Sequence, residues 1–321
     1  METNDINNME NTSSEVNPTN MTDEELDTLL NAVGLDDSDS QDEDNDDGQD
    51  VILDTDDEES SESSSDNVEE PSDSSEIPQN SPSLLVDEST TRFSGAEWFN
   101  AIQRIRVIVA GIGGIGSNFC FQLARMLPAN ITMYDDDIVE KVNMAGQLYC
   151  ADDIGKAKVD AIASMISSYT AMRQVNAIMS KFTENTEPGD IMVCGFDNMK
   201  ARKEFFNSWL YHIDDKSLGD SAKCLFIDGR LSMDTLQVLC IRGDDEYNID
   251  RYQREFLFSD AQAEQTVCSR KQTTYLACMI GSVMVNLLTN FIANTLNPVI
   301  PYDLPFFTEY DSQQMLFKTE N

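Results

Sequence analysis

The chain has 321 residues, of which 59 are acidic and 21 basic, giving a formal net charge of −38. Such an acidic chain repels phosphate backbones, which argues against nucleic-acid binding through its overall charge. The seven cysteines include no Cys-x-x-Cys pair and the one histidine is His212, so the usual Cys/His zinc sites are excluded.

The negative charge is concentrated at the N-terminus, where residues 1–91 hold 30 Asp and Glu residues and no Lys or Arg. This segment is poor in aromatic residues, so it cannot bury enough apolar surface to offset the entropy lost on ordering. We therefore expect a long disordered acidic tail over residues 1–91 and a folded domain over residues 92–321. The odd cysteine count and the apolar surroundings of most cysteines favour free thiols and a cytoplasmic location.

Short patterns with apolar residues interrupt the acidic tail. Residues 21–35 combine a capping box, Thr22 with Glu25, with apolar residues on one helical face. They predict a short helix that either docks in a partner's groove or has no role. The segment from Val51 to Asp54 is apolar and is followed by an acidic run. It resembles a SUMO-interacting motif, which implies a β-grasp partner bound by strand addition.

A glycine-rich turn follows the first predicted elements of the folded part, a helix over 94–103 and a β-branched strand over 104–110. The turn reads GIGGIG over 111–116 and leads into a predicted helix that ends near Met126. Bare backbone and unpaired N–H groups at such a helix start can approach phosphate oxygens. Asp135 ends the next predicted strand, at about the distance expected for a ribose-binding carboxylate. This part of the chain is therefore predicted to bind a nucleotide.

The remaining elements alternate between strands and helices. After a loop over 136–153 we expect a helix over 155–170, strands over 175–182 and 190–196, a helix over 199–213, two strands over 224–231 and 236–242, a polar loop over 243–271, a helix over 272–296, and edge strands over 306–310 and 314–318. This alternation predicts an α/β fold with a doubly wound, mostly parallel, Rossmann-like sheet. The apolar run over 275–288 is too short to span a bilayer, so we expect a core or interface helix and no membrane insertion.

Three further segments follow the glycine turn in a specific order. They are DDDIVEKVNMAGQ over 135–147, GKAK over 155–158 and FDN over 196–198. Together with the turn, they resemble the ThiF/MoeB/ubiquitin-activating superfamily, whose members adenylate a protein C-terminus. In lacking Cys-x-x-Cys pairs the chain resembles the zinc-free members of the superfamily, which include virus-encoded ones. If the chain is virus-encoded, the expected cytoplasmic location is the cytoplasm of the host.

The resemblance implies ATP at the carboxyl ends of the strands and Mg²⁺ held by Asp197. The residues that it places around the nucleotide are Gly111, Gly113, Gly114, Gly116, Asp135, Asp137, Asn143, Gln147 and Lys158. Asp135 would bind the ribose hydroxyls, and Lys158 would lie near the phosphates and act in catalysis. This set suits adenylation, because charge develops on the α-phosphate and on the leaving pyrophosphate while the attacking group is already a carboxylate.

The sequence departs from the family pattern at Gly146, where relatives carry an arginine. A phosphate contact is then missing, or another cation such as Lys141, Lys156 or Arg202 replaces it. The family usually dimerises, and Arg92 is the candidate for an arginine that one subunit supplies to its partner in a homodimer.

Cys268 lies in a polar loop beside Arg270 and Lys271, where relatives carry a cysteine. The two cations would lower the pKa of its thiol, which suits a nucleophile that takes the acyl group as a thioester. The simpler alternative is a loop cysteine with no role. Whether Arg230, in a segment that resembles one following the adenylation strand of relatives, contacts the substrate stays open, and His212 is interpreted as structural.

These patterns favour an ATP- and Mg²⁺-dependent activating enzyme for a ubiquitin-like or other small protein. Two alternatives stay open. One is an adenylating enzyme for a small peptide or carboxylate that needs no cysteine. The other is an inactive nucleotide-binding scaffold, for which the glycine at 146 is the supporting feature.

Overall fold

The computed structural model describes residues 88–258 and 272–321, all within the second of the two units into which the chain divides, Ile77–Asn321. The expected tail helix over 21–35, the segment from Val51 to Asp54 and Cys268 therefore lie outside the described residues. The boundary expected between the tail and the domain at residue 92 also stays a prediction, although Thr90 is already fully buried.

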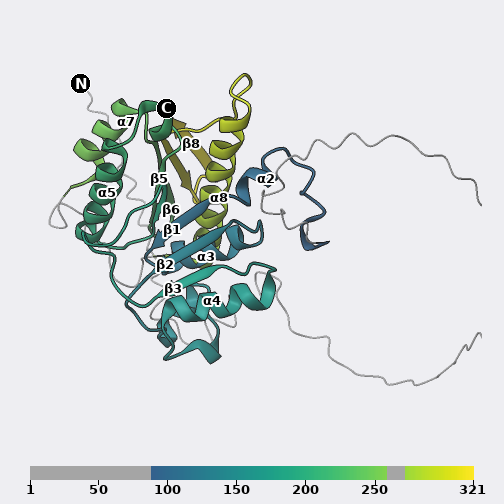
Figure 1. The fold of residues 1–321 in the computed structure, drawn as a ribbon. Coiled ribbons are helices and arrows are strands. Elements are labelled where there is room, and N and C mark those ends of the chain that lie inside the picture. The colour runs from purple at the N-terminus through teal and green to yellow at the C-terminus, as the bar shows by residue number, and fades with distance from the viewer. Residues whose placement is uncertain (1–87, 259–271) are drawn as a thin grey trace, which may run out of the picture. The chain divides into compact units, whose positions relative to one another are not determined.

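An eight-stranded sheet forms the centre of this unit, in the order β3-β2-β1-β4-β5-β6-β7-β8 (Figure 1). The strands are β1 (Arg106–Ala110), β2 (Asn130–Tyr134), β3 (Val175–Ile178), β4 (Ile191–Cys194), β5 (Leu225–Leu231), β6 (Thr235–Arg242), β7 (Phe307–Asp311) and β8 (Leu316–Glu320). Strands β3, β2, β1, β4 and β5 pair in parallel, and β5 to β8 pair antiparallel. This confirms the predicted mostly parallel α/β sheet.

The chain order reverses between β1 and β4, because β2 and β3 lie on one side of β1 and β4 and β5 on the other. In open α/β sheets a ligand binds at the carboxyl ends of the strands beside such a switch point, where the connections run apart. The topology therefore predicts a ligand site at the carboxyl ends of β1, β2, β4 and β5.

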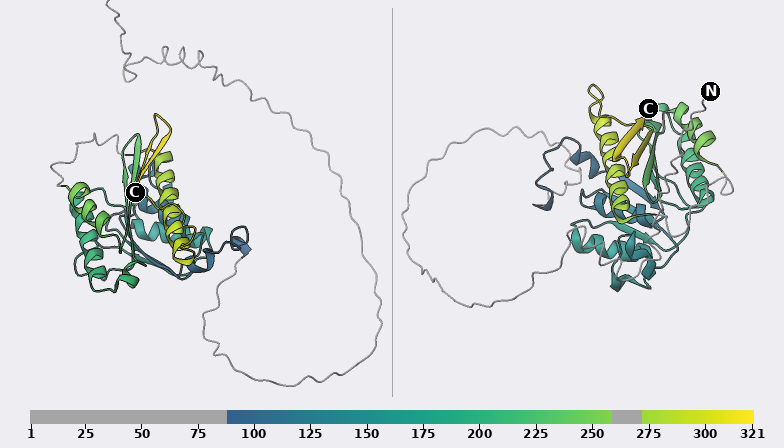
Figure 2. Two further views of the ribbon diagram at one scale, coloured as in Figure 1. Left: turned by 90° about the horizontal axis from the view of Figure 1, so that it is seen from above. Right: turned by 180° about the vertical axis from the view of Figure 1, so that it is seen from behind.

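Helices cover both faces of the sheet (Figures 1 and 2). The core on one side joins α3 (Gly114–Ala124), α4 (Lys158–Tyr169) and α8 (Thr274–Leu296), and that on the other joins α5 (Met199–Asp214) with α7 (Glu246–Arg251). Alternate residues of a strand face opposite sides. In β4, Val193 accordingly joins the first core and Met192 the second. Coverage on both faces explains why this strand is apolar throughout.

Short helical segments complete the described part: η2 (Glu88–Thr90), α2 (Phe99–Ile102), η3 (Lys141–Ala145), η4 (Ala151–Asp153), α6 (Leu218–Ser221) and the π-helical η5 (Tyr252–Phe256). The helix predicted over 94–103 is reduced to α2, and turns precede it. The polar loop predicted after residue 243 contains α7 and η5 instead. Asp245 caps α7 by accepting a bond from the Asn248 N–H at 3.1 Å, and the fully buried Tyr252 anchors η5.

Helix α8 is longer than the apolar run that the sequence indicated. Its 23 residues are long and apolar enough to cross a membrane by length and composition. However, 56% of its most apolar stretch is buried inside the protein, against α3 and the sheet. Such burial is what the core helix of a water-soluble unit shows, and it agrees with the predicted core role.

Candidate functional site

The glycine turn packs directly on the end of β4. Gly111 has a φ of +86°, and a Cβ there would lie 2.7 Å from the carbonyl carbon of Gly195. Backbone bonds tie the turn to both neighbouring strands, from the Gly111 N–H to Tyr134 O at 2.9 Å and from the Gly195 N–H to Ala110 O at 2.8 Å. Only a residue without a side chain fits the positive φ and the close contact with Gly195, so the fold requires glycine at position 111.

A cavity of about 1150 Å³ opens at the carboxyl ends of β1, β2, β4 and β5, in front of the first turn of α3. Eight of the predicted site residues line it: Gly111, Gly113, Gly114, Asp135, Asp137, Gln147, Lys158 and Asp197. Gly116 lies in the first turn of α3, where a Cβ would run into the Gly111 carbonyl, so it shapes the turn without lining the cavity. The sequence motifs thus converge on one site, at the edge that the topology indicates.

Asp135 connects the end of β2 to the glycine turn. Its Oδ2 accepts a hydrogen bond from the Ile112 N–H at 2.7 Å, and its Oδ1 accepts one from the Asp137 N–H at 2.9 Å. Burial raises the pKa of this carboxyl, and the two backbone bonds oppose the rise. A carboxylate has about four acceptor positions. Asp135 can therefore hold the turn and still accept bonds from ligand hydroxyls.

Lys158 begins α4 and is the most buried lysine on the cavity wall, with 9% of its side chain exposed. Its Nζ lies 2.8 Å from Oδ2 of Asp137, and its backbone N–H donates to Asp137 O at 3.1 Å. Lys156, by contrast, pairs with Asp153 at 3.1 Å and does not line the cavity. The position of Lys158 fits the predicted contact with an anion in the cavity.

The space that a side chain at Gly146 would fill is taken by Gln272. A Cβ on Gly146 would lie 2.7 Å from Nε2 and 2.8 Å from Cγ of Gln272, and a Cβ on Gly114 would meet the same amide. Gln272 also lines the cavity. The sequence analysis missed this residue, since it belongs to no motif and lies more than a hundred residues after the turn. Lys141 is exposed and lies away from the cavity.

Asn143 does not line the cavity, although it was placed near the phosphates. Its Oδ1 accepts a bond from the Glu140 N–H at 2.8 Å and caps η3. Gln147, four residues later, does face the cavity, and its Oε1 is buried with no hydrogen-bond partner among the described residues. A buried acceptor without a partner is costly, which indicates that a donor from outside the chain is expected there.

Asp197 lies just after β4 and lines the cavity. The next residue, Asn198, caps α5 by accepting a bond from the Ala201 N–H at 2.9 Å. Mg²⁺ prefers one or two carboxylates together with water and phosphate oxygens. The exposed carboxylate of Asp197, beside a phosphate-type turn, therefore fits a magnesium ion.

Arg202 lines the cavity but is buried and held by protein partners, so it does not replace the family arginine as a mobile phosphate ligand. Its guanidinium is ion-paired with Asp228 and donates to Phe196 O and, at 3.2 Å, to Gly229 O. These bonds brace the ends of β4 and β5 against each other. Arg92 is exposed and does not line the cavity, so its role toward a partner subunit stays a prediction.

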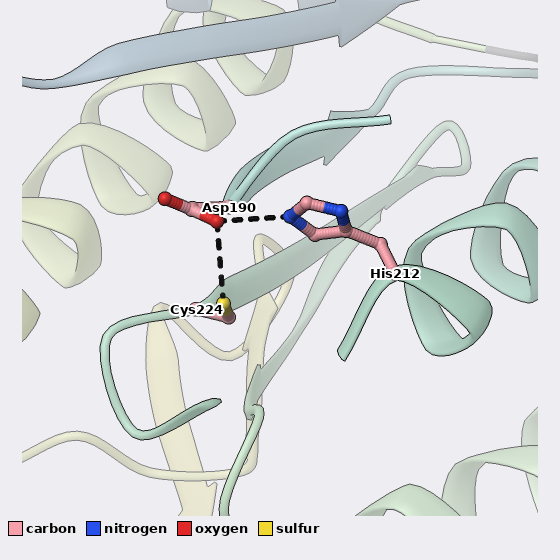
Figure 3. A group of neighbouring side chains, drawn as sticks. All are labelled: Asp190, His212 and Cys224. Carbon is pink, nitrogen blue, oxygen red and sulfur yellow. Dashed lines mark hydrogen bonds and ion pairs between the residues drawn. The ribbon is translucent and has the colours of Figure 1, made fainter. Parts of the chain in front are cut away.

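A second polar cluster lies at the opposite ends of the strands. Oδ1 of Asp190 is 2.9 Å from His212 Nε2 and 3.6 Å from Cys224 Sγ (Figure 3), and Lys216 Nζ lies 3.0 Å from the same oxygen. The ligand atoms of Asp190, His212 and Cys224 lie within 4.8 Å of one another, a grouping that could hold a metal ion. The lysine cation already occupies that oxygen, however, and burial raises the pKa of the Cys224 thiol to about 12. This supports the structural interpretation of His212.

Comparison with known proteins agrees with the geometry. The ThiF family model matches residues 87–320. The chain is 31% identical over 114 residues to the NEDD8-activating enzyme E1 catalytic subunit of Caenorhabditis elegans, covering 34% of this chain and 26% of that protein. It is 27% identical over 136 residues to the SAMP-activating enzyme E1 of Haloferax volcanii, covering 40% and 48%. Each match thus spans less than half of the relative.

The fold is also similar to the crystal structure of E. coli MccB with ATP, with a TM-score of 0.53 and 18% identity, covering 75% of this chain and 73% of that chain. At this identity the likeness concerns the fold alone.

Proposed function

This chain belongs to the ThiF family, and on that basis we propose that it is an ATP-dependent activating enzyme that adenylates the carboxyl terminus of a ubiquitin-like protein. The observation that carries the proposal is the convergence of the glycine turn, Asp135, Lys158 and Asp197 on one cavity at the switch point of the sheet. The named activities of the two E1 relatives support the choice of a ubiquitin-like protein.

ATP is a substrate in this proposal, and each residue of the cavity has a task toward it. The N–H groups of the turn at Gly113 and Gly114 would donate to phosphate oxygens, since they lie at the start of α3. Asp135 would accept bonds from the ribose hydroxyls. Lys158 would exchange its Asp137 partner for a phosphate oxygen. Asp197 would hold Mg²⁺, which supplies further positive charge for the leaving pyrophosphate.

The chemistry needs no general base, because the substrate carboxylate is already a nucleophile at neutral pH. What it needs is alignment of that carboxylate with the α-phosphate and stabilisation of the charge that develops there. The cavity supplies fixed N–H donors and a buried lysine, and the Asp197 carboxylate would add Mg²⁺, which together would meet that requirement.

The second step of the proposal is transfer of the acyl group to Cys268, with release of AMP. The thiolate would attack the acyl carbon, and the bond between that carbon and the phosphate oxygen would break to leave a thioester. A suitable test incubates the enzyme with Mg²⁺, ATP and purified ubiquitin-like proteins, and then separates covalent adducts with and without dithiothreitol. Cys268→Ala should lose a thiol-sensitive adduct that Cys278→Ala, a change at an exposed cysteine of α8, retains.

Adenylation of a peptide or small carboxylate without a thioester is the alternative. Adenylate formation without any thiol-sensitive adduct, in the wild type as in Cys268→Ala, would favour it over thioester formation. The inactive-scaffold hypothesis draws on the neutral Gln272 that occupies the space at Gly146. A protein that fails to bind ATP would support that hypothesis.

The N-terminal tail would concentrate the substrate. If the segment from Val51 to Asp54 binds the β-grasp partner, 37 residues separate it from Arg92. A disordered chain of that length spans roughly 35 Å, which raises the effective substrate concentration toward the millimolar range. Removal of residues 1–90 should therefore raise the KM for the protein substrate with little change in kcat. An unchanged KM would discard the tether.

The proposed enzyme is a cytoplasmic homodimer in which Arg92 reaches the partner's cavity. Size measurement in solution tests the dimer. Mixing Arg92→Ala with Asp197→Ala subunits tests the reach, because activity restored in the mixed dimer requires that the arginine act across the interface.

A further inference from the structure

Two arginines share one buried carboxylate at the end of β5. Asp228 is fully buried, and it is ion-paired with both Arg202 and Arg230. The hydroxyl of Tyr252 also donates to Asp228, at 2.9 Å. Asp228 is thus one buried carboxylate shared by two arginines in a region that water reaches poorly. Burial lowers the pKa of Arg202 and repulsion from Arg230 adds to this effect, while the Asp197 carboxylate opposes it.

Arg230 is held rigidly in this cluster. Its Nε and Nη2 donate to Oδ2 of Asp228 at 3.0 and 2.9 Å, and Nη2 donates to Phe256 O at 2.9 Å. The guanidinium also lies 5.7 Å from the ring of Phe256 and 5.8 Å from that of Phe258. Among the described residues none accepts a hydrogen bond from Nη1. A fixed guanidinium with a spare donor group is suited to binding an oxyanion.

The three lysines that line the cavity in the described part of the chain each have a carboxylate of their own. Lys158 pairs with Asp137 at 2.8 Å, Lys181 with Asp136 at 3.7 Å and Lys200 with Glu204 at 4.0 Å. Arg230 lines the same cavity but shares its carboxylate with the more buried Arg202. Arg230 is therefore a cation of the described wall that has no carboxylate to itself.

The strand order places Arg230 relative to the glycine turn. Strand β5 follows β4 and β1, and neighbouring strands lie about 4.8 Å apart. Arg230 is thus on the order of 10 Å from the turn, on the strand next to β4, which Asp197 follows. That is the side of the cavity away from Asp135, where the reacting end of a nucleotide bound over β1 and β2 would point.

We propose that Arg230 binds an oxyanion of the reaction, either the substrate's terminal carboxylate or a phosphate oxygen of the nucleotide. The inference deepens the proposed function and rests on it for the identity of the anion. Arg230 is a binding residue in this proposal, and Asp228 is the residue that positions it.

The variant Arg230→Gln is expected to fold, because Asp228 then keeps one partner cation, Arg202, and the Tyr252 hydroxyl. Arg230→Lys keeps the charge but loses the planar fork, so it should have an intermediate effect. The matched control is Arg254→Gln. Arg254 is an exposed arginine of η5 that pairs with Asp250 at 2.8 Å and does not line the cavity.

Two measurements distinguish the sources of the anion. The first is calorimetric titration with Mg²⁺–ATP, and the second is the KM for the protein substrate in pyrophosphate exchange. In Arg230→Gln, loss of a charged hydrogen bond should either lower the affinity for Mg²⁺–ATP or raise the substrate KM, by about 10- to 100-fold. A weaker ATP affinity identifies a phosphate oxygen, whereas a raised substrate KM with unchanged ATP affinity identifies the carboxylate. Arg254→Gln should change neither.

Failure of this inference differs from failure of the proposed function. If wild type binds ATP and exchanges pyrophosphate, and Arg230→Gln matches it in both ATP affinity and substrate KM, the inference is wrong and the function stands. If wild type shows no exchange, the proposed function is wrong, and the inference about Arg230 is then tested by the ATP titration alone. An unchanged ATP affinity in Arg230→Gln would overturn the inference in that case too.

Discussion

The Nζ of Lys158 lies 2.8 Å from Oδ2 of Asp137, and both residues line the cavity. Asp137 comes two residues after Asp135, whose carboxylate holds the glycine turn. Lys158 is 9% exposed in its side chain and Asp137 is 66% exposed. The lysine is thus fixed by the protein, while its partner can be displaced toward water. This arrangement keeps a buried cation compensated until a phosphate takes the place of Asp137.

Lys158→Gln should therefore retain the fold and lose activity. Because the lysine would contact charge that increases in the transition state, we expect pyrophosphate exchange to fall by about 100-fold or more. Lys156→Gln is the matched control on the same loop, since Lys156 is half exposed and pairs with Asp153 away from the cavity. Exchange rates and thermal unfolding of both variants check the prediction, and equal losses of exchange would contradict it.

Restoring the family arginine at Gly146 should not improve the enzyme by itself. Gln272 fills the space of a Cβ at this position, so Gly146→Arg should lower the Tm by several degrees. The double variant with Gln272→Ala should recover most of that loss, because the two side chains compete for one space. Thermal unfolding of the two single variants and the double variant gives the coupling. Additive effects would show that Gln272 does not occupy the position.

Gly111 and Gly155 provide a comparison at equal backbone angle. Their φ values are +86° and +87°, but a Cβ on Gly111 would press on the backbone of Gly195, whereas one on Gly155 meets nothing within 4 Å. Gly155→Ala should cost about 1–2 kcal/mol of unfolding free energy for the left-handed conformation alone. Gly111→Ala should cost about 2 kcal/mol more, because the turn must move. Urea unfolding measures both, and similar losses would argue against the close packing of the turn on β4.

The Asp190 cluster should make stability depend on pH. Burial alone would raise the pKa of Asp190, but hydrogen bonds from His212 and Lys216 outweigh it and hold the pKa below its ordinary value. The ionised carboxylate then stabilises the fold above about pH 4, and this contribution is lost as the pH falls through the lower folded-state pKa. Asp190→Asn should lower the Tm by about 2–4 °C at pH 7. The difference should shrink below pH 4; a constant difference would exclude an ionic origin.

Local patterns were sufficient to predict the parallel half of the sheet. The β-branched strand β1, the glycine turn and the apolar β4 each depend on residues close together in the chain. The ends of such strands meet at one edge whatever lies between them. The antiparallel pairing of β5 with β6 was likewise predictable, since a short connection joins two apolar runs.

Contacts between distant segments could not be predicted in this way. Gln272 meets Gly146 where the start of α8 lies against the end of η3, at which Thr274 also donates to Ala145 O, and no pattern in either segment records that contact. Asn143 belongs to a motif, yet its side chain caps η3 by accepting a bond from the Glu140 N–H. The shared pairing of Asp228 with Arg202 and Arg230 joins α5 to β5 and depends on tertiary packing.

Pyrophosphate exchange tests the central claim most directly. Wild-type protein, Asp197→Ala and Cys268→Ala would each be incubated with Mg²⁺, ATP, labelled pyrophosphate and a panel of ubiquitin-like proteins, and label entering ATP would be counted. The account predicts substrate-dependent exchange in wild type and in Cys268→Ala, and its loss in Asp197→Ala. Exchange that is equal in wild type and Asp197→Ala, or absent from wild type with every substrate, would contradict it.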